Sequence, residues 1–365
     1  MRQTFSAGTS HSLFVSEDLC AFGCGNNATG ALGFFDRHSV EPSPVTPFPM
    51  PLNICSVSAG NSFSLFLQPE GIVWTAGKSE YENFSFEWGT VNGAKKMENV
   101  PLIQQISASQ SYHAIFLDID GYAWGCGLNS FGGMGVGHRK NQTQPSKIQN
   151  LPKLSAISAG TYHTLFLSDS GEVWSCGDNT YGQLGVPTSF PAFFPVKLEV
   201  PVPIVSISGG NFHSLFLDID GNVWSCGMNT FGQLGCEVGT LTVSSPRKIS
   251  GVPFVSEISA GQNCSLLLTR DGEVWASGDA KGLNINSPKP KKYSKLPCIT
   301  TMSSSSHYLF LDCNSRIWVT GENCSGQLGT DFDKDYRKRV KLNKRIPPVS
   351  RDSQFTSTKS ARTNQ

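Results

Sequence analysis

The sequence lacks the features that would place it in a membrane, in the secretory pathway or among disordered chains. Charged residues make up only 16% of its 365 residues, too few for a disordered or coiled-coil protein. The longest apolar runs are only as long as a strand, so we expect no membrane-crossing helix. The first residues, Met1 to Ser6, contain no apolar secretory segment. We therefore expect an intracellular protein, cytoplasmic or nuclear.

The chain also lacks a disulfide framework and a basic excess. Its 11 cysteines are odd in number and form no CxxC pair, so a reduced compartment fits best. The net charge is +1, far from the strong basic excess of a nucleic-acid-binding globule. Glycine, in contrast, is abundant: 37 residues, about a tenth of the chain. This composition favours many short strands joined by tight turns.

The chain repeats itself seven times, at intervals of 43 to 52 residues. Each unit has an anchor position, usually the histidine of a Gly-x-x-His motif. An aromatic residue stands eleven positions after each anchor and a glycine fourteen positions after it, in all seven units. The anchors are His11, Phe63, His113, His163, His213, Cys264 and His307.

Each unit predicts about four β-strands. Asp-Gly, as in Asp120-Gly121, lies between two apolar runs, a hairpin signal because both central turn residues favour positive φ. Ile/Val-Ser-Ala-Gly precedes the hairpin, and Asn-x-x-Gly-Gln-Leu-Gly with a Pro-rich link follows it. Four strands per unit in seven units are typical of a β-propeller, and no helical period supports an α-solenoid.

We therefore predict an all-β fold, a seven-bladed β-propeller over residues 1–349, followed by a disordered polar tail over residues 350–365. The predicted units lie near residues 5–33, 57–89, 106–137, 157–186, 207–236, 258–285 and 302–330. The chain starts in mid-unit, because no strand of the Pro-Val-Leu type precedes Phe5. We expect the segments Val340–Leu342 and Ile346–Val349 to complete the first blade, so that pairing of the N- and C-terminal segments closes the ring.

The units resemble the repeats of the regulator of chromosome condensation family. The shared motif is Ala-Gly-x-x-His-Ser-Leu-Phe-Leu-x-x-Asp-Gly-x-Val-Trp-x-x-Gly-x-Asn-x-x-Gly-Gln-Leu-Gly, and Ile157–Gly185 and Ile207–Gly235 carry nearly all of it. The resemblance covers roughly residues 5–349. It implies a seven-bladed propeller, a fold that hosts several unrelated functions.

The family's founding member is a guanine-nucleotide exchange factor that acts on the small GTPase Ran through its Gly-x-x-His turns. Carried over by position, the resemblance implies partner contacts at Ser10, Tyr112, Tyr162, Phe212, Asn263 and Ser306, with the neighbouring His11, His113, His163, His213 and His307. The histidines have an alternative interpretation as buried residues whose ring nitrogens satisfy polar groups at a tight turn. Their repetition once per unit favours this alternative for each single histidine.

No motif indicates covalent chemistry. The sequence contains no Gly-rich phosphate loop, HExxH or GxSxG. Cys24, Cys126, Cys176 and Cys226 come from four different units, so we interpret them as small buried residues and expect no metal site and no cofactor. The Asp118/Asp120 pair ends in a hairpin turn, where aspartate is preferred without calcium.

Two functions remain open. The first is a non-catalytic interaction propeller that binds a protein partner. The alternative is a guanine-nucleotide exchange factor for a Ran-like GTPase, associated with chromatin and without covalent chemistry. The resemblance implies that an exchange factor of this family has an aspartate before the anchor in one blade and a wedge inserted in the third blade. Here no acidic residue precedes the anchor in any unit, and the only sizeable insertion, Lys78–Gly89, lies in the second unit and not the third. These departures favour the first function. We expect a monomer without membrane association.

Positive charge is concentrated near the C-terminus. From Lys334 onward, ten Lys and Arg against two Asp give a net charge of +8, which leaves −7 for residues 1–333. This basic segment is interpreted as a nuclear address, as a contact to nucleic acid or chromatin, or as a solvated edge that prevents aggregation. Its residues are Lys334, Arg337, Lys338, Arg339, Lys341, Lys344 and Arg345.

The aromatic residues predict which face of the propeller binds a partner. Tyr112, Tyr162 and Phe212 stand in the Gly-x-x-His turns of three consecutive units, and aromatic side chains on exposed turns are common interface anchors. The opposite face is expected to offer small, polar Asp-Gly turns with little to bind. The alternative is that these aromatics fold inward and cap the core.

Overall fold

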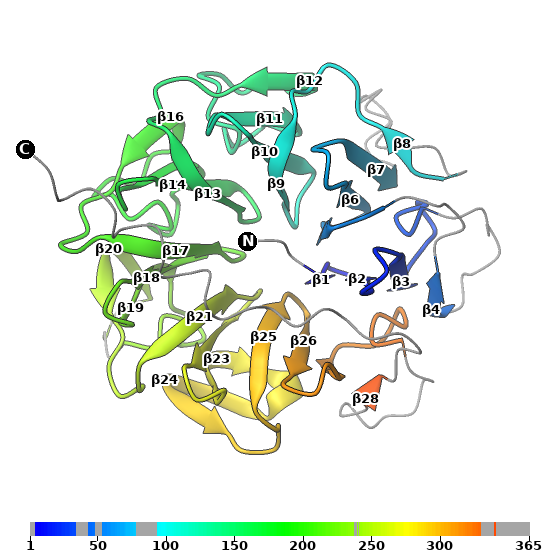
Figure 1. Cartoon of the computed structure of the whole chain (residues 1–365). Coiled ribbons are helices and arrows are strands. Elements are labelled where there is room, and N and C mark those ends of the chain that lie inside the picture. The colour runs from blue at the N-terminus through cyan, green and yellow to red at the C-terminus, as the bar shows by residue number, and fades with distance from the viewer. Residues whose placement is uncertain are drawn as a thin grey trace, which may run out of the picture.

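The computed structural model describes residues 4–33, 43–47, 53–77, 93–236, 239, 241–329 and 339–340. Its strands form seven four-stranded antiparallel sheets, arranged as blades around a central axis (Figure 1). The predicted seven-bladed, all-β propeller is confirmed. The described residues contain one short helix, η1 (Lys281–Leu283), and no helix with the length and apolar character that a membrane crossing needs.

The strands follow the chain from the inner to the outer edge of each blade. Blade one contains β1 (Phe5–Ala7), β2 (His11–Val15), β3 (Ala21–Gly25) and β4 (Ser43–Pro47). Blade two contains β5 (Ser56–Ala59), β6 (Phe63–Leu67), β7 (Val73–Gly77) and β8 (Lys95–Lys96). Blade three contains β9 (Ile103–Ala108), β10 (His113–Asp118), β11 (Ala123–Gly127) and β12 (Gln142–Lys147). Blade four contains β13 (Leu154–Ala159), β14 (His163–Ser168), β15 (Val173–Gly177) and β16 (Ala192–Lys197).

The remaining blades repeat this order. Blade five contains β17 (Ile204–Gly209), β18 (His213–Asp218), β19 (Val223–Met228) and β20 (Thr242–Lys248). Blade six contains β21 (Val255–Ala260), β22 (Cys264–Thr269), β23 (Val274–Ala280) and β24 (Ile285–Tyr293). Blade seven contains β25 (Ile299–Ser304), β26 (His307–Asp312), β27 (Ile317–Gly321) and β28 (Arg339–Val340).

The hydrophobic core lies in the seams between neighbouring blades. In the seam between blades three and four, Ile115 and Leu117 of β10 pack with Ile157 and Phe166 of the next blade. The second strand of six blades supplies a phenylalanine that is at most 2% exposed: Phe14, Phe66, Phe116, Phe166, Phe216 and Phe310. Burying one such side chain contributes roughly 1.5–3 kcal/mol, so each seam is a small core of its own.

The invariant glycine of each unit is explained by a close approach of two strands. Gly127 ends β11 opposite His113 with a φ of +107°, and a Cβ atom there would lie 2.2 Å from the carbonyl oxygen of Tyr112. The hairpins differ from the predicted turn, because only their third residue has positive φ. Gly121 has a φ of +81° and its N–H donates to the Asp118 carbonyl at 3.1 Å, a type I turn followed by a left-handed residue.

The predicted closure of the ring is wrong. Blade one is complete within residues 5–47, with β1 paired to β2 and β4 paired to β3. The C-terminal strand β28 pairs with β27 in blade seven, where Val340 lies opposite Ile317. The strand after each Gly-Gln-Leu-Gly pairs as the fourth strand of its own blade, so blade one takes no strand from the C-terminal segment. Ile346–Val349 and the tail at 350–365 lie outside the described residues.

The ring closes instead through a seam of the same kind as the other six. Phe5 and Phe14 of blade one pack with Leu309 and Leu311 of blade seven. A serine on each inner strand also accepts a hydrogen bond from a backbone N–H of the neighbouring inner strand, and at the closing seam Ser303 Oγ accepts from Ala7 N at 3.0 Å. The seven serines of this belt are Ser6, Ser58, Ser107, Ser158, Ser208, Ser259 and Ser303.

Replacing a belt serine tests the closure. Ser303→Ala should lower the free energy of unfolding by about 1–3 kcal/mol, because the N–H of Ala7 is left buried without an acceptor. Ser58→Ala, which removes the acceptor of Ala108 N at an ordinary seam, should cost the same. Urea unfolding of both variants makes the comparison. A clear loss for Ser58→Ala with none for Ser303→Ala would mean that the terminal seam is held differently.

Candidate functional site

The five anchor histidines lie inside the seams. Their side chains are at most 2% exposed, and each Nε2 meets a hydroxyl on the next blade around the ring. His163 Nε2 lies 2.9 Å from Ser214 Oγ, which donates to the carbonyl of Gln183 at 2.7 Å. The same pairs recur as His11–Ser64, His113–Thr164, His213–Ser265 and, at the closing seam, His307–Ser12. These histidines therefore join blades and are not available to a partner.

The hydroxyl between the two groups sets the protonation state of the histidine. Because Ser214 gives its only proton to Gln183, its oxygen must accept from His163, so Nε2 of the neutral ring carries the hydrogen. Nδ1 of His163 is buried and has no hydrogen-bond partner in the described structure. Burial, and to a smaller extent the neighbouring His213 and His113, lowers the pKa of His163 to about 3.

The two seams without an anchor histidine have changed on both sides. Where Phe63 replaces the histidine, the facing hydroxyl is replaced by Ala114, and both lie in one apolar cluster. Where Cys264 replaces it, its Sγ lies 3.4 Å from the hydroxyl of Tyr308. The anchor and its partner therefore change together, which keeps buried polar groups paired.

One carboxyl group is also used in a seam. Glu257 Oε1 on β21 accepts from Met302 N at 3.0 Å and from Thr301 Oγ1 at 2.9 Å. In blade three the same place holds Gln105, which accepts from Ile157 N and donates to its carbonyl, both at 3.1 Å. Burial raises the pKa of Glu257 to about 7. The carboxyl group thus substitutes for an amide that links two blades.

The other polar motifs are structural as well. Cys24, Cys126, Cys176 and Cys226 are fully buried, one in each of four blades. Asp118 Oδ1 accepts from the backbone N–H of Asp120 and Tyr122, and its Oδ2 accepts from the indole of Trp124 at 2.8 Å. Within the described ranges, no group of three or more His, Cys, Asp or Glu side chains is placed to hold a metal ion.

Aromatic side chains form a connected band on one face of the ring. The histidine face is the face at which the Gly-x-x-His turns and the Asn-x-x-Gly loops emerge. There the Tyr162 ring lies 4.5 Å from Phe131 and 6.0 Å from Phe212, whose ring is 5.2 Å from Tyr181. We call Phe131, Tyr162, Tyr181 and Phe212 the aromatic band. It crosses blades three, four and five, and Phe131 at its end is 39% exposed.

The turn aromatics Tyr162 and Phe212 are neither fully exposed anchors nor caps folded into the core. Tyr162 and Phe212 are half-buried, but they pack against other rings of the surface. At the outer side of the band the Arg139 guanidinium lies 5.2 Å from the ring centre of Phe193, which covers Gly132 next to Phe131. A positive charge therefore borders the aromatic surface.

The remaining predicted contact residues lie elsewhere. Tyr112 is half-buried in the turn of blade three, while Ser10, Asn263 and Ser306 are half-buried in blades one, six and seven. Ser306 Oγ donates to the Thr9 carbonyl at 2.7 Å across the closing seam. Arg339 falls in β28, and the rest of the basic segment lies outside the described residues: Lys334, Arg337, Lys338, Lys341, Lys344 and Arg345.

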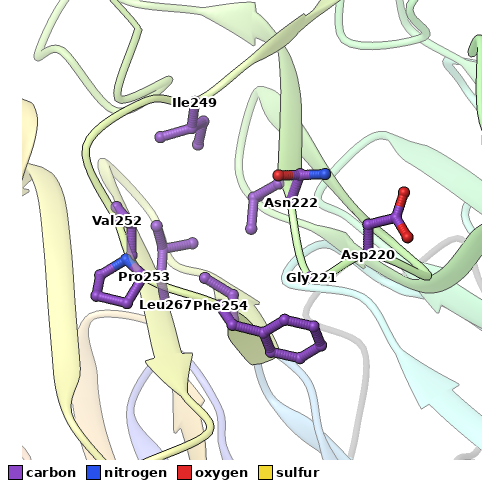
Figure 2. Close-up of a pocket in the computed structure, with 10 residues that line it drawn as sticks. Asp220, Gly221, Asn222, Ile249, Val252, Pro253, Phe254 and Leu267 are labelled. Carbon is purple, nitrogen blue, oxygen red and sulfur yellow. The ribbon is translucent and has the colours of Figure 1, made fainter.

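The opposite face, which we call the hairpin face, is more apolar than expected. Ile119 and Ile219 stand in its turns with exposures of 59% and 49%. A small pocket lies there between blades five and six, with Val252 and Leu267 in its wall, Phe254 beside them and Asp220 at the rim (Figure 2). Asp220 is its only ionisable lining residue, so the pocket offers binding without a general acid–base pair.

Sequence reasoning missed half of the aromatic band. Phe131 and Tyr181 occupy the residue before the first glycine of the Asn-x-x-Gly loops, and Phe231, 40% exposed, holds the same position in blade five. That signal was visible as an aromatic residue in three consecutive units. The serine belt was visible too, as a serine at the same position of every inner strand.

Comparison with known families confirms the resemblance seen in the motifs. Two models described as Regulator of chromosome condensation (RCC1) repeat match this chain. The first matches residues 120–167, 170–217 and 220–268, and the second matches residues 103–132, 155–183 and 204–233. Residues 103–268 of the chain therefore carry regulator of chromosome condensation repeats.

Individual proteins show the same relation. The human probable E3 ubiquitin-protein ligase HERC6 is 34% identical over 167 residues, which are 42% of this chain and 16% of the ligase. Human WBSCR16 superposes with a TM-score of 0.78 at 21% identity, over 88% of this chain and 94% of its own. Yeast RCC1 (Prp20) bound to Kap60 superposes with a TM-score of 0.79 at 21% identity, over 90% and 85%. At such identities the two structures show a shared fold.

Prp20p from Saccharomyces cerevisiae is also known from a crystal structure reported with its binding properties to Gsp1p and histones. It superposes with a TM-score of 0.73 at 22% identity, over 83% of this chain and 80% of its own.

The buried histidines predict a loss of stability in acid. In the unfolded chain a histidine binds its proton below about pH 6.5, whereas burial lowers the folded pKa of His213 to about 4. Between these values the unfolded state binds more protons, so the stability present above about pH 6.5 is lost as the pH falls towards 4. Glu257, with a raised folded pKa, opposes this trend as a single group.

Urea unfolding between about pH 7 and 4.5 measures this slope. His213→Gln keeps a neutral donor for Ser265 and should flatten the profile by about one proton. The control His138→Gln, at an exposed histidine, should leave the profile unchanged. Equal slopes for wild type and His213→Gln would contradict the account of the buried neutral ring.

Proposed function

We propose that this ring of regulator of chromosome condensation repeats is a non-catalytic interaction propeller, and that it binds a protein partner with the aromatic band. The observation that carries the proposal is the continuity of the band, in which four rings from three blades lie within 6.0 Å of their neighbours. Single exposed apolar residues are ordinary, whereas a connected aromatic surface is typical of an interface.

The residues that repeat from unit to unit support this proposal as well, because they have a structural use. His163, Ser214 and Gln183 hold the blades together and are fully buried, so a partner at the surface does not reach them. Tyr162 and Tyr181 carry a hydroxyl group on an apolar ring, which gives contact area and a polar tip at once. Arg139 beside the band favours a partner with acidic groups around an apolar centre.

The likeness to HERC6 is consistent with a binding role. The match covers 42% of this chain and only 16% of that ligase. We therefore propose for this chain only the interaction role of such repeats, and the ligase activity is not part of the proposal.

A second candidate is nucleotide exchange on a Ran-like small GTPase at chromatin, in the nucleus. It is favoured by Prp20p, whose structure was reported with its binding properties to Gsp1p and histones. The third blade does not add support for nucleotide exchange. The connection from Gly127 to Gln142 in blade three has the same length as that from Gly177 to Ala192 in blade four, so no wedge is inserted.

Removing two neighbouring rings of the band should weaken partner binding without unfolding the ring. Phe131→Ala combined with Tyr162→Ala should weaken binding at least ~30-fold, because each aromatic anchor contributes about 2 kcal/mol or more. Partners captured by the wild type are identified by mass spectrometry and their affinities are measured. Ile119→Ala, on the hairpin face, is the matched control and should bind normally. Full binding by the double variant would remove the band from the account.

The exchange function has its own test. A Ran-type GTPase loaded with fluorescent GDP should release the nucleotide faster with catalytic amounts of the propeller, if exchange is its activity. The double variant should then lose this effect while Ile119→Ala keeps it. Unchanged release at saturating propeller would reject exchange and leave the interaction role standing.

A further inference from the structure

Two exposed cysteines occupy opposed backbone positions at the hairpin end of blade seven. Ile299 of β25 lies opposite Asp312 of β26 in the antiparallel ladder, so the next pair outward is Cys298 and Cys313. The N–H of Cys313 donates to the Cys298 carbonyl at 3.0 Å, which continues the ladder by one step. Both thiols are free and exposed.

The other blades show how side chains lie at this pair. In blade six the equivalent residues are Phe254 and Arg270, and the Arg270 guanidinium lies 5.1 Å from the centre of the Phe254 ring. In blade three they are Leu102 and Ile119, which are 51% and 59% exposed. Side chains at this pair therefore reach solvent, and in blade six they meet.

The backbone spacing suits a covalent link. Directly opposed, hydrogen-bonded residues of an antiparallel pair have Cα atoms about 5.5 Å apart. Disulfides span Cα separations of roughly 4.4–6.8 Å. Cys298 Sγ now lies 3.8 Å from the carbonyl oxygen of Asp271, on the hairpin of blade six. Rotation about the Cα–Cβ bond of Cys298 releases that contact and turns the sulfur towards Cys313.

We propose that Cys298 and Cys313 are a redox-sensitive pair that forms a reversible disulfide within blade seven. Hydrogen peroxide oxidises one thiolate to a sulfenic acid, which leaves one oxygen of the peroxide on sulfur and releases the other as water after proton uptake. The second thiolate then attacks that sulfur, forms the S–S bond and expels the hydroxyl group as a second water. A dithiol reductant returns both thiols.

The rest of the chain makes the reaction selective. Seven cysteines are buried in the seams and loops, and burial raises the pKa of Cys24 and of Cys264 to about 12, so that their thiols stay protonated. Cys324 is exposed, but it lies in the Asn-x-x-Gly loop at the other end of blade seven. Cys20 is half-buried in the hairpin of blade one. Among the described residues, only Cys298 and Cys313 are exposed cysteines that lie opposite each other on paired strands.

The sequence allows a direct test on the whole chain. No Lys or Arg lies between Leu296 and Arg316, so trypsin leaves both cysteines in one peptide. After mild peroxide treatment and alkylation, this peptide should lack alkyl groups and be two hydrogens lighter than its reduced form. Treatment with dithiothreitol before alkylation should restore two alkylated cysteines.

Two variants complete the test. Cys324→Ser should leave the disulfide unchanged, whereas Cys313→Ser should leave Cys298 alkylated or oxidised further. Retention of a dithiol-specific arsenical by the wild type, and its loss in Cys313→Ser, reports the pair without any oxidant. A peptide that stays alkylated at both cysteines under peroxide, or a disulfide that joins two chains instead, would overturn the proposal.

Discussion

Four seams of this ring share one hydroxyl group that accepts from a histidine and donates to a backbone carbonyl at the same time. Ser214 does this between His163 and Gln183, and the arrangement requires a neutral imidazole with its proton on Nε2. Charging the ring would bury an unpaired N–H and a positive charge together. The exchange of histidine and hydroxyl for Phe63 and Ala114 at one seam shows the same constraint, because both polar partners are absent there together.

This constraint divides the positions of each repeat into two classes. Residues that recur in nearly every unit lie in the seams. The histidines are among them, and because they are buried they do not form a contact ring. Positions that vary between units are free to differ from blade to blade. Phe131, Tyr181 and the turn aromatics belong to this second class, and they coincide in neighbouring blades three to five. Cys298 and Cys313 belong to it as well, on the opposite face.

Most of the fold could be predicted from the sequence because its causes are local. The hairpin glycine and the apolar runs lie within one unit, and the repeat length follows from comparing the units with one another. The closure could not be predicted, because a repeat does not reveal whether its Pro-rich strand pairs backward or forward. The orientation of His163 could not be predicted either, since it depends on Ser214 in the next blade. The positions of Tyr162 and Phe212 in the Gly-x-x-His turns were predicted from the sequence. Their contact within one band depends on how neighbouring blades are placed in the ring, which the sequence does not show.

The ring closes through a seam equal to the other six. Amide hydrogen exchange of the seven N–H groups that donate to the serine belt tests this closure most directly. The account predicts that Ala7 N–H, which donates to Ser303 at the closing seam, exchanges as slowly as Ala159 N–H, which donates to Ser107. Exchange at Ala7 that is orders of magnitude faster than at Ala159, in the intact chain, would contradict it.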